Sequence, residues 1–160
     1  MRAHLTHSAG WLAGLLFLLL SQPTRCGLPT VNFEAAEIPP AIIITEGKTS
    51  QGFPYLFGGV SSNEREAMEA RAKGYNVKLV FAAKDGSFIS GVNVMIITAK
   101  GAEVASLATD GPWFYIQLPP GSYSIKATFK GATRQIKELK VTKDKTAHQG
   151  FVWDLGKNNN

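Results

Sequence analysis

The sequence predicts an all-β protein, an antiparallel sandwich of seven strands preceded by one short amino-terminal α-helix. Apolar and polar residues alternate with a period of two from Tyr75 onward, which is typical of half-buried strands. Gly, Pro and Asp separate the alternating runs, and the chain holds 16 Gly and 8 Pro. In a chain of 160 residues, 44% hydrophobic and 18% charged residues indicate one globular domain and exclude a disordered protein.

Residues 1–26 have the pattern of a cleaved signal peptide. Arg2 precedes an apolar run of ten residues, 11–20, and Pro23 follows it. About twenty apolar residues are needed to cross a bilayer, so this run is short for a permanent anchor. We therefore expect an exported protein, periplasmic or secreted. A lipoprotein with its lipid on Cys26 and an uncleaved membrane anchor are the alternatives.

Removal of residues 1–26 leaves a mildly basic chain with few metal-binding groups. It takes away Arg2 and Arg25 and no acid, so 17 basic residues become 15 against 12 acids and the net charge falls from +5 to +3. It also takes away the single Cys and two of the three His, which leaves His148. A disulfide framework and a Cys/His zinc site cannot be built, and we expect neither metal nor cofactor.

Between the signal peptide and the alternating region we expect an irregular leader and one helix. The leader, residues 27–60, is interrupted by Pro and Gly, with one short strand at 42–44. Its aromatic residues Phe53, Tyr55 and Phe57 are too apolar for a solvated linker, so we expect them to pack on the domain. The helix spans 61–74. Either Ser61 or Ser62 can cap it, Glu64 stands three residues after Ser61 as in a capping box, and Gly74 is a left-handed stop.

The sandwich itself is expected over 75–155, followed by a disordered tail at 156–160. The alternation slips between Ile136 and Leu139, which predicts a bulge near Lys137 or Glu138 in an edge strand. The seven predicted strands are 77–81, 92–96, 103–109, 113–118, 123–130, 133–141 and 147–155.

One segment of this region is similar to a known family. Residues 109–127 read TDGPWFYIQLPPGSYSIKA, with a turn at Gly131, and Asp85-Gly86 followed by Gly91-Val92-Asn93-Val94 lies upstream. The pattern resembles the carboxypeptidase regulatory-like domain of bacterial exported proteins over about residues 75–155. The resemblance implies a transthyretin-like, or prealbumin-like, sandwich of seven strands and a non-catalytic accessory or adhesive role.

The hydroxyisourate hydrolases also have a transthyretin-like fold, but their pattern is different. They are recognised by several His and Arg residues and by a carboxyl-terminal Tyr-Arg-Gly-Ser. Here the chain ends in GKNNN and His148 is the one imidazole after residue 26, so we expect no enzyme. A catalytic His148 would need a nucleophile and an acid that the sequence does not show at a known spacing.

Two groups of residues are candidates for binding. Trp113 and Tyr115 alternate with Phe114 and Ile116 and so lie on the other face of their strand. Either the leader covers them, through Phe53, Tyr55 and Phe57, or they form an exposed aromatic surface for a sugar or a protein.

The second group is a basic strip between Lys126 and Lys145. Seven basic residues stand there against Glu138 and Asp144, a local net charge of +5. The strip either attracts polyanions, such as anionic lipids and acidic glycans, or protects an edge strand from aggregation. Its members are Lys126, Lys130, Arg134, Lys137, Lys140, Lys143 and Lys145.

These features lead to one functional expectation and one alternative. We expect a non-enzymatic, exported accessory or interaction module of the cell envelope that binds a protein partner. The alternative is a binder of carbohydrate or polyanion through the aromatic face and the basic strip. No nucleic-acid recognition motif is present, so nucleic acid is not an expected partner.

Overall fold

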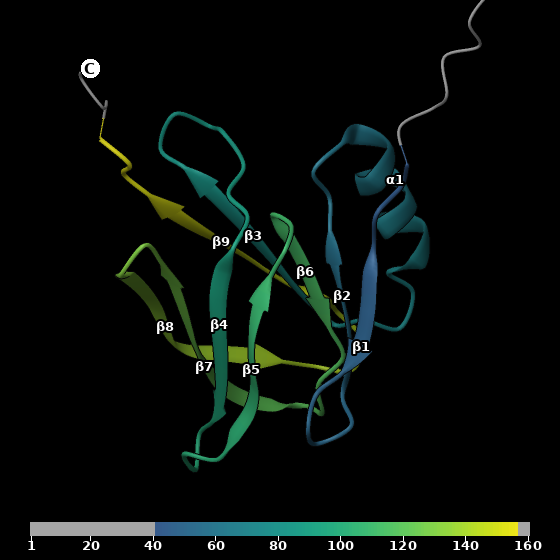
Figure 1. Ribbon diagram of the computed structural model, residues 1–160. Helices are drawn as coiled ribbons and strands as arrows, with labels where there is room; N and C mark the ends of the chain where they lie inside the picture. The colour runs from purple at the N-terminus through teal and green to yellow at the C-terminus, as the bar shows by residue number, and fades with distance from the viewer. Residues whose placement is uncertain (1–40, 157–160) are drawn as a thin grey trace, which may run out of the picture. The chain divides into compact units, whose positions relative to one another are not determined.

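The protein is a two-sheet β-sandwich with one helix (Figure 1). The computed structural model describes residues 41–156, which belong to one compact unit. The expected signal peptide, the first part of the leader and residues 157–160 lie outside the described residues. The prediction of a mostly β protein with one short helix is confirmed.

Nine strands form the two sheets, where seven were predicted. The five-stranded sheet has the order β1-β2-β6-β3-β9, and the four-stranded sheet has the order β5-β4-β7-β8. The five-stranded sheet contains β1 (Thr45–Lys48), β2 (Pro54–Gly58), β3 (Val77–Ala83), β6 (Trp113–Ile116) and β9 (Ala147–Trp153). The four-stranded sheet contains β4 (Val92–Thr98), β5 (Glu103–Thr109), β7 (Gly121–Phe129) and β8 (Ala132–Val141).

The two additional strands come from the segment predicted as an irregular leader. Strand β2 pairs with β1 on one side and with β6 on the other, so it is an interior strand of the sheet. Pro54 is tolerated because it is the first residue of β2, where a missing N–H costs little. The short strand expected at 42–44 forms three residues later, as β1, and Ile42 and Ile43 are exposed.

Strands β3 and β9 pair in parallel, so the expectation of a purely antiparallel sandwich is wrong at this position. The pairing runs from Val77 beside Ala147 to Ala83 beside Trp153. Alternation in a sequence reports which residues face the core but not the direction of the neighbouring strand. The other strand pairs in both sheets are antiparallel.

The main core lies between the sheets and consists of the alternating residues that the pattern predicted. Leu79, Phe81, Ile96, Phe114 and Ile125 are all completely buried. Burial of one such side chain stabilises the fold by about 1.5–3 kcal/mol. Trp153, at the end of β9, is 1% exposed and donates a hydrogen bond from Nε1 to the backbone oxygen of Ala132.

Helix α1 (Ser62–Arg71) covers the outer face of the five-stranded sheet. Of the two predicted caps, Ser61 is the one used, since its Oγ accepts a hydrogen bond from the Glu64 backbone N–H. The helix ends at Arg71 instead of Gly74, which adopts a positive φ of 98° two residues after the Ala72 cap. Among the described residues, no helix is long and apolar enough to cross a membrane.

The predicted bulge is confirmed, and it lies in an edge strand. Strand β8 is the last strand of its sheet. Ile125 pairs with Ile136 and Tyr123 with Leu139, so Lys137 and Glu138 both lie opposite Ser124. The extra residue bends the edge strand and interrupts its ladder, which discourages pairing with another chain.

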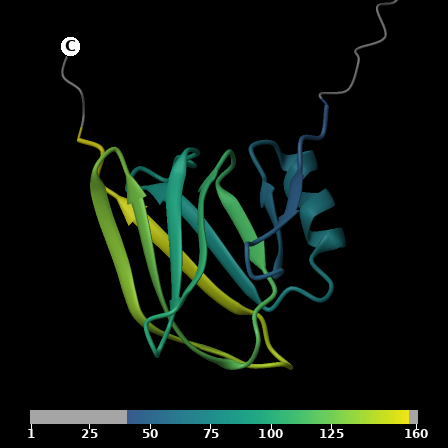
Figure 2. The same cartoon turned by 60° about the horizontal axis from the view of Figure 1, so that its bottom comes forward.

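The two ends of the sandwich differ, and we name them by the helix. At the N-cap end, α1 begins, Gly58 lies beside Trp113, and Ala83 lies beside Trp153. At the pocket end, α1 has ended, and the segment before β3 meets the β6–β7 and β8–β9 connections. Figure 2 shows that the first and last described residues both lie at the N-cap end.

Candidate functional site

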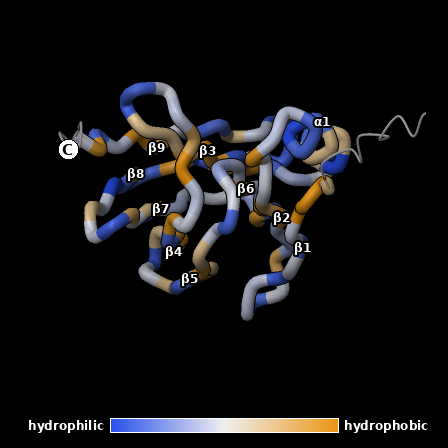
Figure 3. Tube along the Cα trace, turned by 45° about the horizontal axis from the view of Figure 1, so that its top comes forward, coloured by the Kyte–Doolittle hydropathy of each residue, from blue (hydrophilic) through white to orange (hydrophobic). Residues whose placement is uncertain are grey.

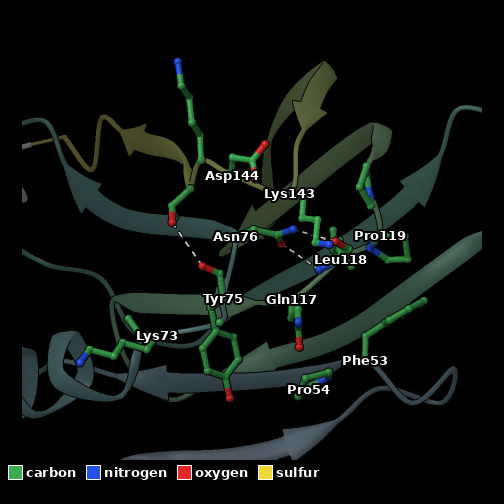
Figure 4. Close-up of a pocket in the computed structure, with 15 residues that line it drawn as sticks. Phe53, Pro54, Lys73, Tyr75, Asn76, Gln117, Leu118, Pro119, Lys143 and Asp144 are labelled. Carbon is green, nitrogen blue, oxygen red and sulfur yellow. Dashed lines mark hydrogen bonds between the residues drawn. The ribbon is translucent and has the colours of Figure 1, made fainter.

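A cavity of about 610 Å³ opens at the pocket end (Figure 4). Four segments that are distant in the sequence line it. They are the start of β2 (Phe53, Pro54), the chain after α1 (residues 72–76), the β6–β7 connection (residues 117–120) and the β8–β9 loop (residues 143–146). We call this cavity the end pocket.

Asn76 joins three of these segments through its side-chain amide. Its Oδ1 accepts a hydrogen bond of 2.9 Å from the Leu118 backbone N–H. Its Nδ2 donates to the Leu118 carbonyl at 2.7 Å and to the Thr142 carbonyl at 3.3 Å. Thr146 Oγ1 adds a bond of 3.2 Å to the Tyr75 carbonyl. The end pocket is therefore held open by a hydrogen-bonded frame.

The side walls of the end pocket are apolar rings. Figure 4 shows Gln117 between Tyr75 on one side and Phe53 on the other, with Pro119 nearby. Tyr75 is half-buried because its ring packs edge-on against Tyr115, with the centroids 6.4 Å apart. Phe53 is half-buried against the main core. An extended chain or a sugar ring finds two aromatic surfaces here.

The polar groups of the end pocket can donate hydrogen bonds to a ligand. Gln117 is exposed, and no hydrogen bond joins its side-chain amide to another described residue. Burial, followed by the charge of Glu46, raises the pKa of the Tyr75 phenol above its ordinary value of 10.0. Tyr75 thus remains a neutral hydroxyl at physiological pH.

The rim of the end pocket is basic. Three lysines, Lys73, Lys143 and Lys145, line it together with a single carboxylate, that of Asp144. None of the three forms an ion pair with another described residue. Figure 4 shows Lys73 extending away from Gln117, so its ammonium reaches a ligand only beyond the rim. The local excess of two positive charges favours an anionic ligand.

The predicted aromatic pair, Trp113 and Tyr115, lies outside the end pocket and under α1. Tyr115 is 3% exposed and forms a small second core with Leu56 and Met68, against which Trp113 packs. The two side chains are covered, as one of the two alternatives predicted, but helix α1 and Leu56 cover them. Phe53, Tyr55 and Phe57 instead join the main core between the sheets. The residues therefore do not form an exposed stacking surface.

A buried lysine accompanies this aromatic pair. The Lys78 ammonium lies 3.4 Å from the centre of the Trp113 ring and 5.2 Å from that of Tyr115. Its Nζ is 3.5 Å from Glu69 Oε1 on the helix. Lys78 is 8% exposed, so the protein fills this aromatic site with its own cation.

The predicted basic strip separates into several locations in the structure. Lys126 and Lys140 point outward from the four-stranded sheet, opposite Gln135 and Ser122. Arg134 pairs with the inward-facing Ala127, and its Nε donates to the Val152 carbonyl of β9.

The remaining members of the strip lie elsewhere. Lys137 is in the bulge of β8, and Lys130 is in the β7–β8 turn with a φ of 46°. Only Lys143 and Lys145 contribute to the end pocket. The residues that sequence reasoning missed are Tyr75, Asn76 and Gln117, which are adjacent only after the four segments have come together.

The outer face of the four-stranded sheet carries a smaller hollow of about 380 Å³ around Lys126. Its other polar lining residues are Asn93, Ser106, Thr128, Thr133 and Gln135. Thr128 and Thr133 share a hydrogen bond of 2.9 Å. This hollow has one cation and no aromatic ring among its lining residues, so it offers less to a ligand than the end pocket.

The described part has few side chains grouped in a way that could support catalysis. Over residues 41–156, no three His, Cys, Asp or Glu residues come together as a metal site. His148 is exposed in β9, where it pairs opposite Lys78.

The chain was compared with family models and with curated proteins. No family model and no curated protein matches the chain. The end pocket is therefore interpreted from its own residues.

Proposed function

We propose that this chain is a non-enzymatic, exported interaction module of the cell envelope, periplasmic or secreted, that holds an acidic segment of a protein partner in the end pocket. The observation that carries the proposal is the combination of three unpaired lysines with an apolar, aromatic-walled cavity. Such a cavity buries the side chains of an extended segment while the lysines contact its carboxylates.

The proposal includes the fold family and the route to the envelope. Strands β3 to β9 fall within the range that resembles the carboxypeptidase regulatory-like domain, and they occupy two facing sheets. This arrangement supports a transthyretin-like sandwich to which β1 and β2 have been added. The pattern of residues 1–26 supports export with a cleaved signal peptide.

The frame around Asn76 supports binding over catalysis. A rigid pocket loses little conformational entropy when it binds, which favours affinity. Its titratable lining groups are Tyr75, Asp144 and the three lysines, and Asp144 lies in the exposed β8–β9 loop. This set suits the recognition of an anion.

The experiment is a pull-down from envelope extract followed by titration of the retained protein. The Lys143→Ala, Lys145→Ala double variant should lower the affinity about tenfold, because two exposed ion pairs contribute about 1 kcal/mol at most each. The matched control is Lys126→Ala, Lys140→Ala, which removes the same charge from the outer face of the four-stranded sheet.

Equal losses in the two double variants would show a non-specific response to net charge and contradict the proposal. An acidic glycan is the second candidate, because Tyr75 and Phe53 flank the free amide of Gln117. A uronic-acid oligosaccharide that binds the wild type, and binds Gln117→Ala more weakly, would favour this candidate over a protein segment.

A further inference from the structure

An acidic stretch of sequence precedes the described part of the chain. Residues 33–40 read FEAAEIPP, with two acids, Glu34 and Glu37, and no basic residue, so their net charge is −2. Cleavage after residue 26 leaves these residues in the mature chain. It also creates a positive amino group at Gly27, seven residues before Glu34. We call residues 33–38 the acidic segment.

The end pocket has the opposite charge. Its lining holds Lys73, Lys143 and Lys145 against Asp144, an excess of two positive charges. The charged residues around the lining do not cancel this excess, because together they add one more positive charge. They are the ion pairs of Arg71 with Glu46 and of Lys78 with Glu69, the opposite charges Lys100 and Glu103 beside the β4–β5 turn, Lys140 and Glu138 in β8, and Lys48, which pairs with Pro54.

The apolar side chains of the two also match. Phe33 and Ile38 flank the acids of the acidic segment. Tyr75 and Phe53, the aromatic walls of the end pocket, are only half-buried and so keep ring surface free for a ligand. Contact between these side chains removes apolar surface of both from water, which favours binding.

The acidic segment joins the described chain at the end of the sandwich opposite to the end pocket. Figure 3 shows the hydrophobic start of the described chain beside α1. The Ile43 carbonyl lies next to Gly58, the residue of β2 at the N-cap end. Pro54, at the other end of β2, lines the end pocket. Four residue steps of about 3.3 Å separate Gly58 from Pro54, a distance of about 13 Å.

This connection is too short for Glu37 to reach the end pocket of its own chain. The chain would have to reverse its direction before Ile43 and run back beside β1. A reverse turn uses four residues, so Glu37 would extend at most about 10 Å from Ile43 along the sandwich. The acidic segment of a second copy is free of this restriction.

We propose that the acidic segment of one copy binds in the end pocket of a second copy, so that the mature chain associates head to tail. The inference rests on the proposed function, because it names the acidic partner of the same pocket. The carboxylates of Glu34 and Glu37 contact the rim lysines, and Phe33 and Ile38 pack against the aromatic walls. Since the contact joins two different surfaces, further copies can add at either end.

The first test is sedimentation of the mature chain, residues 27–160, at about 1 μM to about 1 mM. The mean mass should rise with concentration. Glu34→Gln, Glu37→Gln should weaken the association about tenfold, as two exposed ion pairs would. The control is Lys126→Glu, Lys137→Glu, which reverses two charges outside the end pocket and should associate like the wild type.

An exchange of charges identifies the two surfaces in contact. Glu34→Lys, Glu37→Lys and Lys143→Glu, Lys145→Glu should each abolish association alone, because like charges then meet. A mixture of these two variants should associate again, since every acidic segment then meets an end pocket of opposite charge. Lys143 and Lys145 are exposed, so we expect the far-UV circular dichroism of the variants to match that of the wild type.

Three results would overturn the proposal. The first is a wild type that remains monomeric over the whole range. The second is a Glu34→Gln, Glu37→Gln variant that associates like the wild type, and the third is a mixture of the exchanged variants that does not associate. If the monomeric protein still retains an envelope partner through Lys143 and Lys145, the proposed function stands and self-association alone is wrong. Loss of both would contradict the proposed function as well.

Discussion

The Asn76 side chain connects separate segments of the backbone. Its amide makes three hydrogen bonds to the backbone of two other segments. Replacement by Ala leaves those backbone groups without partners. We expect Asn76→Ala to lower the free energy of unfolding by about 2 kcal/mol, measured by urea denaturation.

Gln117 provides the matched control for this prediction. It lines the same end pocket but is exposed and bonded to no other described residue through its side chain. Gln117→Ala should change the stability by less than about 0.5 kcal/mol. Similar losses in the two variants would mean that the frame of the pocket does not depend on Asn76.

Tyr123 makes the stability sensitive to alkaline pH. Burial raises the pKa of its phenol above the ordinary 10.0, and its hydroxyl donates a 2.8 Å bond to the Pro119 carbonyl. Above pH 10 the unfolded chain loses a proton that the folded protein keeps, so the free energy of unfolding must fall as the pH rises through this range. Below pH 10 this contribution is fully present.

Tyr123→Phe isolates this effect. At neutral pH the variant should be about 1 kcal/mol less stable than the wild type, since it lacks the bond to Pro119. Between neutral pH and about pH 10.5, however, its stability should decline less steeply, as followed by urea denaturation at each pH. An equally steep decline in the variant would assign the alkaline sensitivity to other groups, such as Tyr75.

At the scale of elements, α1 stabilises the sandwich through a single large side chain. Met68 is completely buried against Leu56 and Tyr115. Met68→Ala leaves a cavity beneath the helix, and we expect a loss of about 2–4 kcal/mol in the free energy of unfolding. The fluorescence of Trp113 should shift to the red as the helix loosens.

Ala70→Ser serves as the control for Met68, since Ala70 is exposed on the same helix. It should leave the stability within about 0.5 kcal/mol of the wild type and the fluorescence unchanged. If Met68→Ala behaves in the same way, the second core contributes little to holding α1 on the sheet.

The elements that the sequence predicted correctly are those with a local signal. Alternation and Gly or Pro turns identified the regions of β3 to β9, and the adjacent Ser61 and Ser62 located the start of α1 to within one residue. Strand β2 was missed because a buried interior strand is apolar on both faces and so shows no alternation. The parallel pairing of β3 with β9 depends on residues far apart in the chain and has no local signal.

The candidate site was less accessible to sequence reasoning than the fold. The aromatic pair and the basic strip were selected because their members are neighbours in the sequence. In the structure, α1 covers Trp113 and Tyr115, while the bulge and the edge of β8 distribute the basic residues over different surfaces. The end pocket combines four segments, so only the folded chain identifies it.

At the scale of the whole molecule, the sandwich has two ends with different chemistry. The pocket end carries Lys73, Lys143 and Lys145 around an aromatic-walled cavity. The N-cap end carries both ends of the described chain and the exposed apolar residues Ile42, Val60 and Phe88.

The position of β9 also has a consequence for the order in which the chain can fold. Val77 pairs with Ala147, which is synthesised 70 residues later, and Trp153 completes the core beside Phe81 and Phe151. Contacts of such long range form slowly, and a growing chain cannot close this core before its last strand has left the ribosome. An unfinished chain therefore lacks the strand that completes the five-stranded sheet and the main core.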